Sequence, residues 1–277
     1  IFGEEYIKEI NLNKISNYNQ KILPETQFIK LLFTKIKIES INTGAENYFY
    51  ALNKKKGELK KKFFIDIFED EIYILDSTGT LLKINNFSNF SEKKIENNIS
   101  KLKPLDVKDF HILGEEIFIS YSFEVEKNCN VLKIAKAKIN NFPLKFESFF
   151  EPKECNNNII AGKMSTYNHN GKKGLLVTTG SDGRSKKKYA QLDSSVYGKI
   201  LFFDLKTKDF QIFSKGHRNP QGLHIFKNLI FSTEHGPKGG DEINLIEFGK
   251  NYGWPISSYG EPYNFKYNDK SGYKFLK

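Results

Sequence analysis

The most restrictive feature of this sequence is a long succession of short strand-like runs separated by turn residues. Such runs occupy residues 64–67, 71–75, 81–84, 110–113, 117–120, 131–134, 174–178, 199–203 and 229–232. Each run is rich in β-branched or aromatic side chains and is bounded by Asp, Gly or Asn, the pattern of a β-strand between turns. The nearest approach to a helical period is a weak one over residues 7–15. The chain is therefore predicted to be all-β.

The spacing of these runs narrows the choice of architecture. Many short antiparallel strands suit a β-propeller, a β-sandwich or a large barrel. Groups of strands that recur about every 40–50 residues have the length of a propeller blade. No linker or change of composition divides the chain. Residues 1–277 are therefore predicted to form a single β-propeller domain or a fragment of one.

The positive charge of the chain suggests an anionic partner, and the scarcity of arginine limits which kinds of partner are expected. The formal net charge is +10, with 43 Lys and Arg residues. Only Arg184 and Arg218 are arginines, and bidentate recognition of phosphate and guanine favours arginine, so no nucleic-acid partner is expected. An anionic surface such as an outer membrane or an acidic polysaccharide stays open as a partner. No stretch approaches the roughly 20 apolar residues that span a bilayer.

The two cysteines, Cys129 and Cys155, adjoin Asn-rich sequence. Neither lies in a CxxC, CxxCH or zinc-binding spacing, which argues against a metal or redox site at these positions. Both adjoin predicted strand ends, which favours a disulfide over two unrelated thiols. A disulfide would imply an oxidising compartment.

Three segments in the C-terminal third carry most of the chemical information. They are residues 216–223 (GHRNPQGL), 234–245 (EHGPKGGDEINL) and 249–255 (GKNYGWP). The glycines beside Gly236 and Pro237 let main-chain carbonyls turn toward an ion or ligand. Asp241 and Glu242 add carboxylates, and Ca²⁺ binds carbonyl and carboxylate oxygens together. The second segment therefore predicts a calcium site, although such Gly/Pro/Asp clusters also form ordinary turns.

Two side chains in these segments suggest an anionic ligand nearby. Arg218 opens a turn ahead of a predicted strand, and its planar guanidinium suits a carboxylate-bearing ligand. Trp254 is the single tryptophan of the chain and lies in a tight aromatic turn. The ordinary explanation of a lone tryptophan is a core residue.

Taken in order, the three segments resemble the glucose/sorbosone dehydrogenase family, which includes the soluble aldose sugar dehydrogenases. Upstream, residues 178–183 (TTGSDG) and the AQ and GKI sequences of residues 190–191 and 198–200 are similar to further segments of that family. The resemblance is concentrated in residues 159–259. Before residue 150 only the rhythm of strands agrees.

The resemblance implies a six-bladed β-propeller that binds pyrroloquinoline quinone (PQQ) and Ca²⁺ and oxidises aldose sugars. It implies that the carbonyls of Gly236 and Pro237 bind the Ca²⁺ at the quinone. It also implies that Arg218 and Asn219 contact PQQ. A second, structural Ca²⁺ would be bound by the residues matching that site, Glu242 and the carbonyl of Tyr252. A periplasmic or exported location follows from the family as well, although no signal peptide is visible in this chain.

The sequence departs from the family where catalysis takes place. The family's catalytic histidine opens an H-x-x-G-R motif, and Ile159 stands at the matching position here. An alkyl side chain cannot accept a proton, so the catalytic residue is unknown. Asp182 matches the region that orients the missing histidine. His217 and His235 are candidate substitutes, with a hydrogen-bonded structural imidazole as the ordinary alternative for each.

Length is the second departure, because the family's chain continues beyond the point where this one stops at Lys277. The expectation is a truncated product, a fragment, or a propeller closed in another way. Three functions follow. They are a PQQ- and Ca²⁺-dependent sugar dehydrogenase, impaired if the base is lost; a non-catalytic propeller that binds a sugar or a protein; and a basic surface-binding protein without a small-molecule site. The oligomeric state and the sugar are left open.

Overall fold

The computed structural model describes residues 4–11, 28–35, 62–85, 91–156, 158–181, 189–260 and 274–275. The chain divides into two compact units, residues 1–60 with 85–92 and residues 61–84 with 93–277. In the first unit the described elements are two antiparallel strands, β1 (Glu4–Asn11) and β2 (Phe28–Lys35). The weak helical pattern over residues 7–15 was misleading, because residues 7–11 pair with β2 as a strand.

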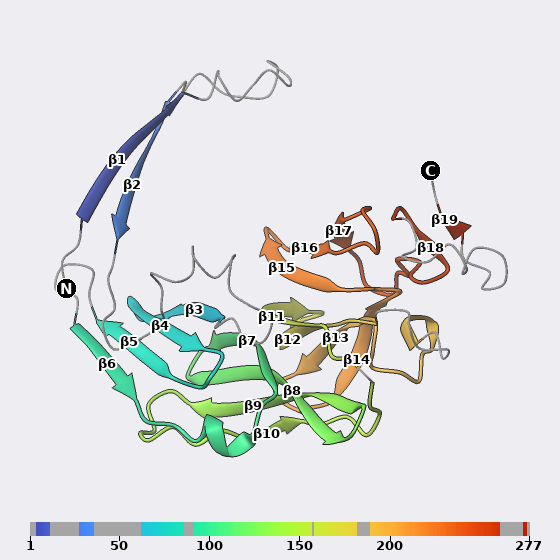
Figure 1. Ribbon diagram of the computed structural model, residues 1–277, viewed down its shortest axis with the longest axis horizontal. Coiled ribbons are helices and arrows are strands. Elements are labelled where there is room, and N and C mark those ends of the chain that lie inside the picture. The colour runs from blue at the N-terminus through green and yellow to red at the C-terminus, as the bar shows by residue number, and fades with distance from the viewer. Residues whose placement is uncertain are drawn as a thin grey trace. The chain divides into compact units, whose positions relative to one another are not determined.

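The second unit contains three four-stranded antiparallel sheets and one three-stranded sheet within its described residues (Figure 1). The strands are, in chain order, β3 (Phe63–Phe68), β4 (Glu71–Asp76), β5 (Leu81–Asn85) and β6 (Ser91–Ile95); β7 (Asp106–Leu113), β8 (Glu116–Glu126), β9 (Cys129–Lys138) and β10 (Glu147–Phe150); β11 (Ala161–His169), β12 (Lys172–Thr179), β13 (Lys199–Asp204) and β14 (Phe210–Lys215); and β15 (Pro220–Phe226), β16 (Leu229–Glu234) and β17 (Glu242–Ile246). Two 3₁₀ helices, η3 (Ile99–Leu102) and η4 (Tyr189–Gln191), lie between strands, and β18 (Ser257–Ser258) pairs in parallel with β19 (Lys274–Phe275). Every run predicted from the sequence lies inside one of these strands.

The first strands of consecutive sheets lie next to one another. β7 contacts both β3 and β11, and β11 contacts β15. Each sheet is an up-and-down meander whose first strand lies innermost, and the sheets follow one another in chain order (Figure 1). This arrangement is a β-propeller, as predicted. The count of six blades and a single domain over residues 1–277 stay predictions.

Apolar side chains on both faces of each sheet hold neighbouring sheets together. In β12, Leu175 and Val177 pack in a cluster shared with the β7–β10 sheet, whereas Leu176 packs with Ile230 of the β15–β17 sheet. Because both faces of such a strand are buried, its sequence is a continuous apolar run and shows no alternation. The core therefore lies between the sheets.

Side-chain hydroxyls tie the β7–β10 and β11–β14 sheets to the first strand of the next sheet. Ser120 of β8 donates its hydroxyl to the carbonyl of Gly162 in β11, at 2.6 Å. In the next sheet, Thr178 of β12 donates to the carbonyl of Pro220 in β15, at 2.8 Å. The second bond fixes the residue that directly follows Asn219, and so it anchors the segment singled out in the sequence.

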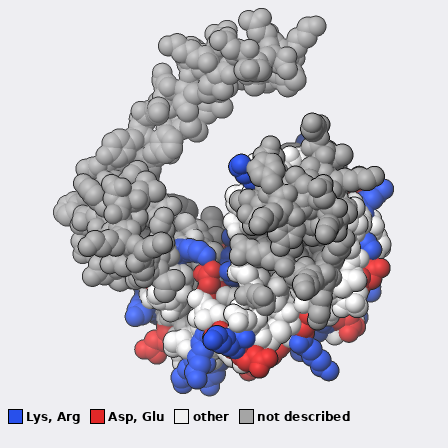
Figure 2. Space-filling model, turned by 45° about the vertical axis from the view of Figure 1, so that its right-hand side comes forward, with Lys and Arg blue, Asp and Glu red and all other residues white. Residues whose placement is uncertain are grey.

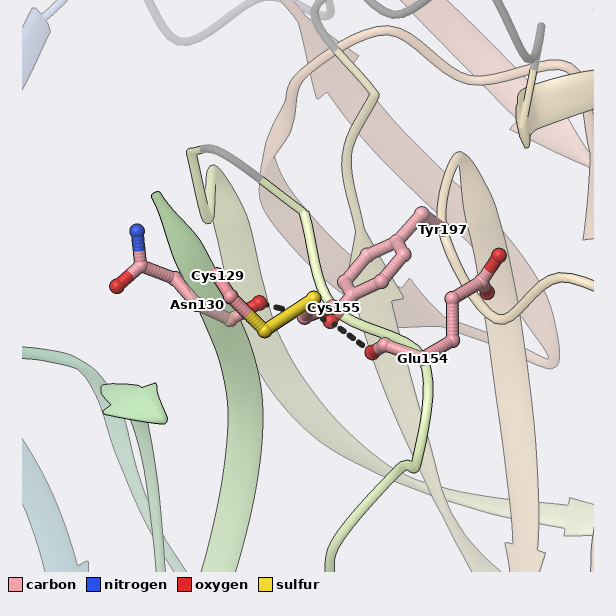
Figure 3. Close-up of a disulfide and its surroundings, with 5 residues drawn as sticks. All are labelled: Cys129, Asn130, Glu154, Cys155 and Tyr197. Atoms are coloured by element: carbon pink, nitrogen blue, oxygen red, sulfur yellow. Dashed lines mark hydrogen bonds between the residues drawn. A yellow bond between two sulfur atoms is a disulfide. The ribbon is translucent and has the colours of Figure 1, made fainter. Parts of the chain in front are cut away.

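The two cysteines form a disulfide, which confirms the pairing favoured by the sequence (Figure 3). Cys129 begins β9, and Cys155 lies beyond β10 with its Cα 5.1 Å from that of Cys129. Beside the bridge, the hydroxyl of Tyr197 donates to the carbonyl of Glu154 at 3.0 Å. The bridge thus ties the start of β9 to the loop between β10 and β11, and the Tyr197 hydrogen bond ties that loop to the residues just before β13.

The surface of the described residues does not present one uniform charge in the view of Figure 2. Acidic side chains lie among the basic ones on that face. Exposed ion pairs such as Lys215–Asp193, 2.7 Å apart, illustrate this mixing. Within the described part of the chain, none of the helices has the length and apolar character needed to cross a membrane.

Candidate functional site

The three C-terminal segments of the sequence converge on one pocket. Residues 216–219 connect β14 to β15, residues 235–241 connect β16 to β17, and residues 252–254 follow β17. The pocket is lined by Gly216, Arg218, Glu234, His235, Gly236, Glu242, Tyr252, Trp254, Ser257 and Ser258. The tertiary structure therefore brings Arg218 and Gly236, predicted for the PQQ and Ca²⁺ site, to the same pocket as Glu242 and Tyr252, predicted for a second Ca²⁺ site.

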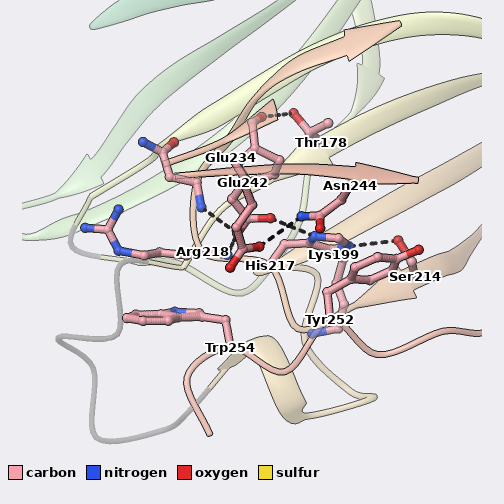
Figure 4. A network of polar contacts seen from close by, with 12 residues as sticks. Thr178, Lys199, Ser214, His217, Arg218, Glu234, Glu242, Asn244, Tyr252 and Trp254 are labelled. Carbon is pink, nitrogen blue, oxygen red and sulfur yellow. Dashed lines mark hydrogen bonds and ion pairs between the residues drawn. The ribbon is translucent and has the colours of Figure 1, made fainter. Parts of the chain in front are cut away.

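Two neighbouring residues hold the Arg218 side chain in place, and one of its nitrogen atoms can still donate a hydrogen bond to a ligand. Its guanidinium donates to the carbonyl of His235 at 2.7 Å. The guanidinium also lies 5.5 Å from the centre of the Trp254 ring (Figure 4). The indole N–H of Trp254 in turn donates to the carbonyl of Ser181 at 2.7 Å. The Nε atom of Arg218 is buried and has no hydrogen-bond partner among the described residues. A buried donor without a partner points to a ligand at this position.

Asn219, like Arg218, has a buried polar side-chain atom without a hydrogen-bond partner among the described residues. Its main-chain N–H donates to Glu234 Oε1 at 3.1 Å, and its carbonyl accepts the N–H of His235 at 3.2 Å. The side-chain Oδ1 is buried and unpartnered within the described part of the chain. The two residues predicted to contact PQQ are thus two of the few that carry orphaned polar atoms.

The turn that contains Gly236 and Pro237 leaves their carbonyl oxygens without hydrogen bonds from any described residue. The N–H of Gly236 donates to Asp241 Oδ1 at 2.9 Å, and this bond is the main cause that lowers the pKa of the Asp241 carboxyl. A Cβ at position 236 would come within 2.1 Å of the carbonyl oxygen of Gly239, so only glycine fits. Free carbonyl oxygens beside a carboxylate are the donor set that Ca²⁺ prefers.

Glu242 and Tyr252 also line the pocket. Glu242 is directly opposite Glu234 in the β16–β17 pair. Burial, with the neighbouring charge of Glu234, raises the pKa of the Glu242 carboxyl. The carbonyl oxygen of Tyr252 accepts no hydrogen bond from the described residues. Two adjacent carboxylates and a free carbonyl are an arrangement that a divalent cation would relieve.

Ile159, Asp182, His217 and His235 were the remaining candidates from the sequence. Ile159 is 3% exposed, packs in the apolar cluster with Met164 and Val177, and does not line the pocket. Asp182 lies outside the described residues. His217 is fully buried and hydrogen-bonded, the structural alternative anticipated for it. His235 lines the pocket and lies 3.3 Å from Asp241 Oδ2.

Two residues that help to hold the pocket together, Glu234 and Gln191, were not identified as site residues from the sequence. Glu234 accepts hydrogen bonds from three neighbouring groups, and Gln191 donates to the carbonyl of Trp254 at 2.6 Å. A carboxylate that ends the otherwise uncharged run of residues 229–233 was the available signal for Glu234. No cluster of three or more His, Cys, Asp or Glu side chains suited to a metal occurs among the described residues, so a cation here would depend on main-chain oxygens.

Comparison with known proteins agrees with the motifs. The family model described as Glucose / Sorbosone dehydrogenase matches residues 107–274. Aldose sugar dehydrogenase YliI of Escherichia coli is 48% identical over 65 residues, which are 22% of this chain and 18% of that protein. Quinoprotein glucose dehydrogenase B of Acinetobacter calcoaceticus is 46% identical over 65 residues, 23% of this chain and 12% of that protein. The matched segments thus span less than a fifth of these relatives.

Solved structures agree in fold. The soluble aldose sugar dehydrogenase of Escherichia coli in its apo form has a TM-score of 0.60 at 20% identity, covering 77% of this chain and 70% of that one. The PQQ-bound aldose sugar dehydrogenase of Streptomyces coelicolor has a TM-score of 0.55 at 17% identity, covering 79% and 67%. With the family model matched over more than half of its length, this chain belongs to the glucose/sorbosone dehydrogenase family.

Proposed function

We propose that this protein binds PQQ and Ca²⁺ in the pocket between β15, β16 and β17 as a soluble aldose sugar dehydrogenase. The observation that carries the proposal is the pair of buried atoms, Nε of Arg218 and Oδ1 of Asn219, that have no partner among the described residues. They lie on a loop of the same pocket as the carbonyls of Gly236 and Pro237, which accept no hydrogen bond from a described residue. A cationic donor and an amide oxygen suit the polar edge of PQQ, and the carbonyls suit Ca²⁺. Glu242 and the Tyr252 carbonyl are proposed to bind a second Ca²⁺.

When bound, PQQ would accept a hydride from the anomeric carbon of a sugar, and Ca²⁺ would act as the Lewis acid that polarises the quinone. The chain's own contribution is binding and orientation. Trp254 stacks beneath the Arg218 guanidinium and limits its motion, and His235 holds the guanidinium through its carbonyl. No base is assigned, because the aliphatic Ile159 is buried in the core.

The absence of a base at Ile159 supports a second candidate, a propeller that binds a sugar or protein without turnover. Titration of the purified protein with PQQ and Ca²⁺, followed by dye reduction with a panel of aldoses, separates the two. Turnover supports the dehydrogenase, whereas PQQ binding without turnover supports the binding module. Failure to bind PQQ at any Ca²⁺ concentration would rule out the first candidate.

The location is proposed to be the periplasm or another exported site. The Cys129–Cys155 disulfide supports this, because disulfides persist in oxidising compartments.

Arg218→Ala is expected to weaken PQQ binding about 30-fold, the effect of losing a charge-assisted hydrogen bond of about 2 kcal/mol. Lys227→Ala is the matched control, because it removes one positive charge from the exposed β15–β16 turn of the same sheet. Isothermal titration at fixed Ca²⁺ gives both affinities. Equal affinities for the two variants would show that the guanidinium does not contact the cofactor.

A further inference from the structure

Glu234, at the end of β16, is a carboxylate for which the proposed chemistry has no direct use. Its residue is 6% exposed. Oε2 lies 3.0 Å from Nδ1 of His217, and Oε1 accepts the main-chain N–H groups of both Arg218 and Asn219. One buried carboxylate therefore contacts three consecutive residues of the segment that carries the PQQ-binding side chains (Figure 4).

His217 locks this carboxylate in place. Its ring is fully buried, its Nε2 lies 2.8 Å from the hydroxyl of Ser214, and it stacks on the ring of Tyr252 at a centroid distance of 4.8 Å. The main-chain N–H of His217 donates to the carbonyl of Gly198 at 3.1 Å. Contacts hold the His217 ring at both nitrogens and on one face, so the ring has little freedom to move. Because Glu234 Oε2 is bound to this ring, the position of that oxygen is held as well.

The bonds to Oε1 have a geometric consequence for the site. The N–H groups of Arg218 and Asn219 point to the same oxygen, which fixes the orientation of two successive peptide groups. The Cα–Cβ directions of both residues follow from those peptide orientations. The unpartnered Nε of Arg218 and Oδ1 of Asn219 belong to these same two side chains. Groups that orient ligand-binding residues contribute to affinity without touching the ligand.

We infer that Glu234 is a positioning residue that, supported by His217, sets the orientation of Arg218 and Asn219 for ligand binding. The inference rests on the proposed PQQ site and goes beyond it, because Glu234 contacts the platform only through main-chain N–H groups and the imidazole. Glu242, the other acidic side chain that faces Glu234, makes a separate hydrogen bond to the amide of Asn244 at 3.0 Å. Its loss would not release the 216–219 segment.

Three variants test the inference. Glu234→Ala removes all the contacts, whereas in Glu234→Gln the amide oxygen can still accept both N–H groups and the NH₂ can donate to His217. Ile134→Ala in the β7–β10 sheet is the matched control, because it destabilises the core at a distance from the pocket. Hydrogen exchange of the 216–221 peptide without ligand is measured first, and PQQ affinity at saturating Ca²⁺ second.

We expect Glu234→Ala to weaken PQQ binding about 10- to 100-fold and to speed exchange in the 216–221 peptide by at least about tenfold. Glu234→Gln should stay within about threefold of the wild type in both measurements, and Ile134→Ala should bind PQQ as the wild type does. Unchanged exchange in Glu234→Ala, or an equal loss of affinity in Ile134→Ala, would overturn the inference. If the wild type itself binds no PQQ, the proposed function fails and the exchange measurement alone decides the role of Glu234. If Glu234→Ala does not fold, Glu234→Asp replaces it, since it keeps the charge but withdraws the carboxylate from the N–H groups.

Discussion

Replacing both cysteines with serine, Cys129→Ser and Cys155→Ser, is expected to lower the free energy of unfolding by about 3 kcal/mol. The bridge closes a loop with a sequence separation of 26 residues. In the chain-entropy account, the unfolded chain gains conformational freedom when this crosslink is lost. Guanidinium unfolding followed by circular dichroism would measure the difference between the oxidised wild type and the double variant.

The position of the bridge adds a local effect. Glu154, next to Cys155, accepts the hydroxyl of Ser195 at 2.7 Å and the N–H of Val196 at 3.2 Å. Loss of the bridge should therefore also speed hydrogen exchange around residues 195–197. Wild-type protein in reductant serves as the control and should match the double variant. A stability loss well below about 1 kcal/mol would show that the loop is equally constrained without the bridge.

The unfolding free energy of this protein should rise by roughly 3 kcal/mol between pH 8 and pH 10.5 through one buried side chain, Lys199. Its residue is 0% exposed, and burial lowers the pKa of its amine from 10.5 to about 8. The amine donates to the carbonyls of Tyr189, Ala190 and Tyr197, at 2.7, 3.1 and 2.9 Å. These bonds hold the two ends of residues 189–197, a segment that includes Gln191, the donor to the carbonyl of Trp254.

The sign follows from proton binding. Between the folded pKa and the unfolded pKa, the unfolded chain holds a proton on Lys199 that the folded chain has released, so stability increases with pH. Below pH 8 and above pH 10.5, both states have the same charge at this residue and its contribution is constant. Lys199→Met should abolish the rise, whereas Lys227→Met at an exposed turn should retain it. Parallel pH profiles for the wild type and Lys199→Met would contradict the assignment.

Much of the fold could be predicted from local pattern alone. The run at residues 199–203 is buried on both faces, and the continuous apolar stretch over residues 200–203 reflects that burial. Turn residues between runs define meanders, and the spacing of the meanders indicates blades. The strand over residues 7–11 escaped prediction because its sequence has no clear period of two, and its pairing with β2 decides the outcome.

Part of the site was also accessible. Gly236 and Arg218 are residue types with a recognisable chemical use in a binding site, and both line the pocket. The role of Glu234 was hidden, since a glutamate at a strand end is ordinary until its partners are known. Ile159 illustrates the opposite case. The motif placed it at a catalytic position, but whether an isoleucine faces a pocket or a core depends on which sheet packs against it.

The sequence by itself therefore determined the all-β class, the propeller, the family and the residues with metal- and anion-binding chemistry, because these depend on local propensity and residue type. Only the tertiary structure decided which of those residues share a pocket, that Cys129 and Cys155 pair, and that Glu234 contacts His217, Arg218 and Asn219. The physical reason is the distance along the chain over which the determining interactions act. Strand formation is dictated by neighbours along the chain, whereas burial, hydrogen-bond partners and pKa shifts are set by residues that folding brings together from distant positions.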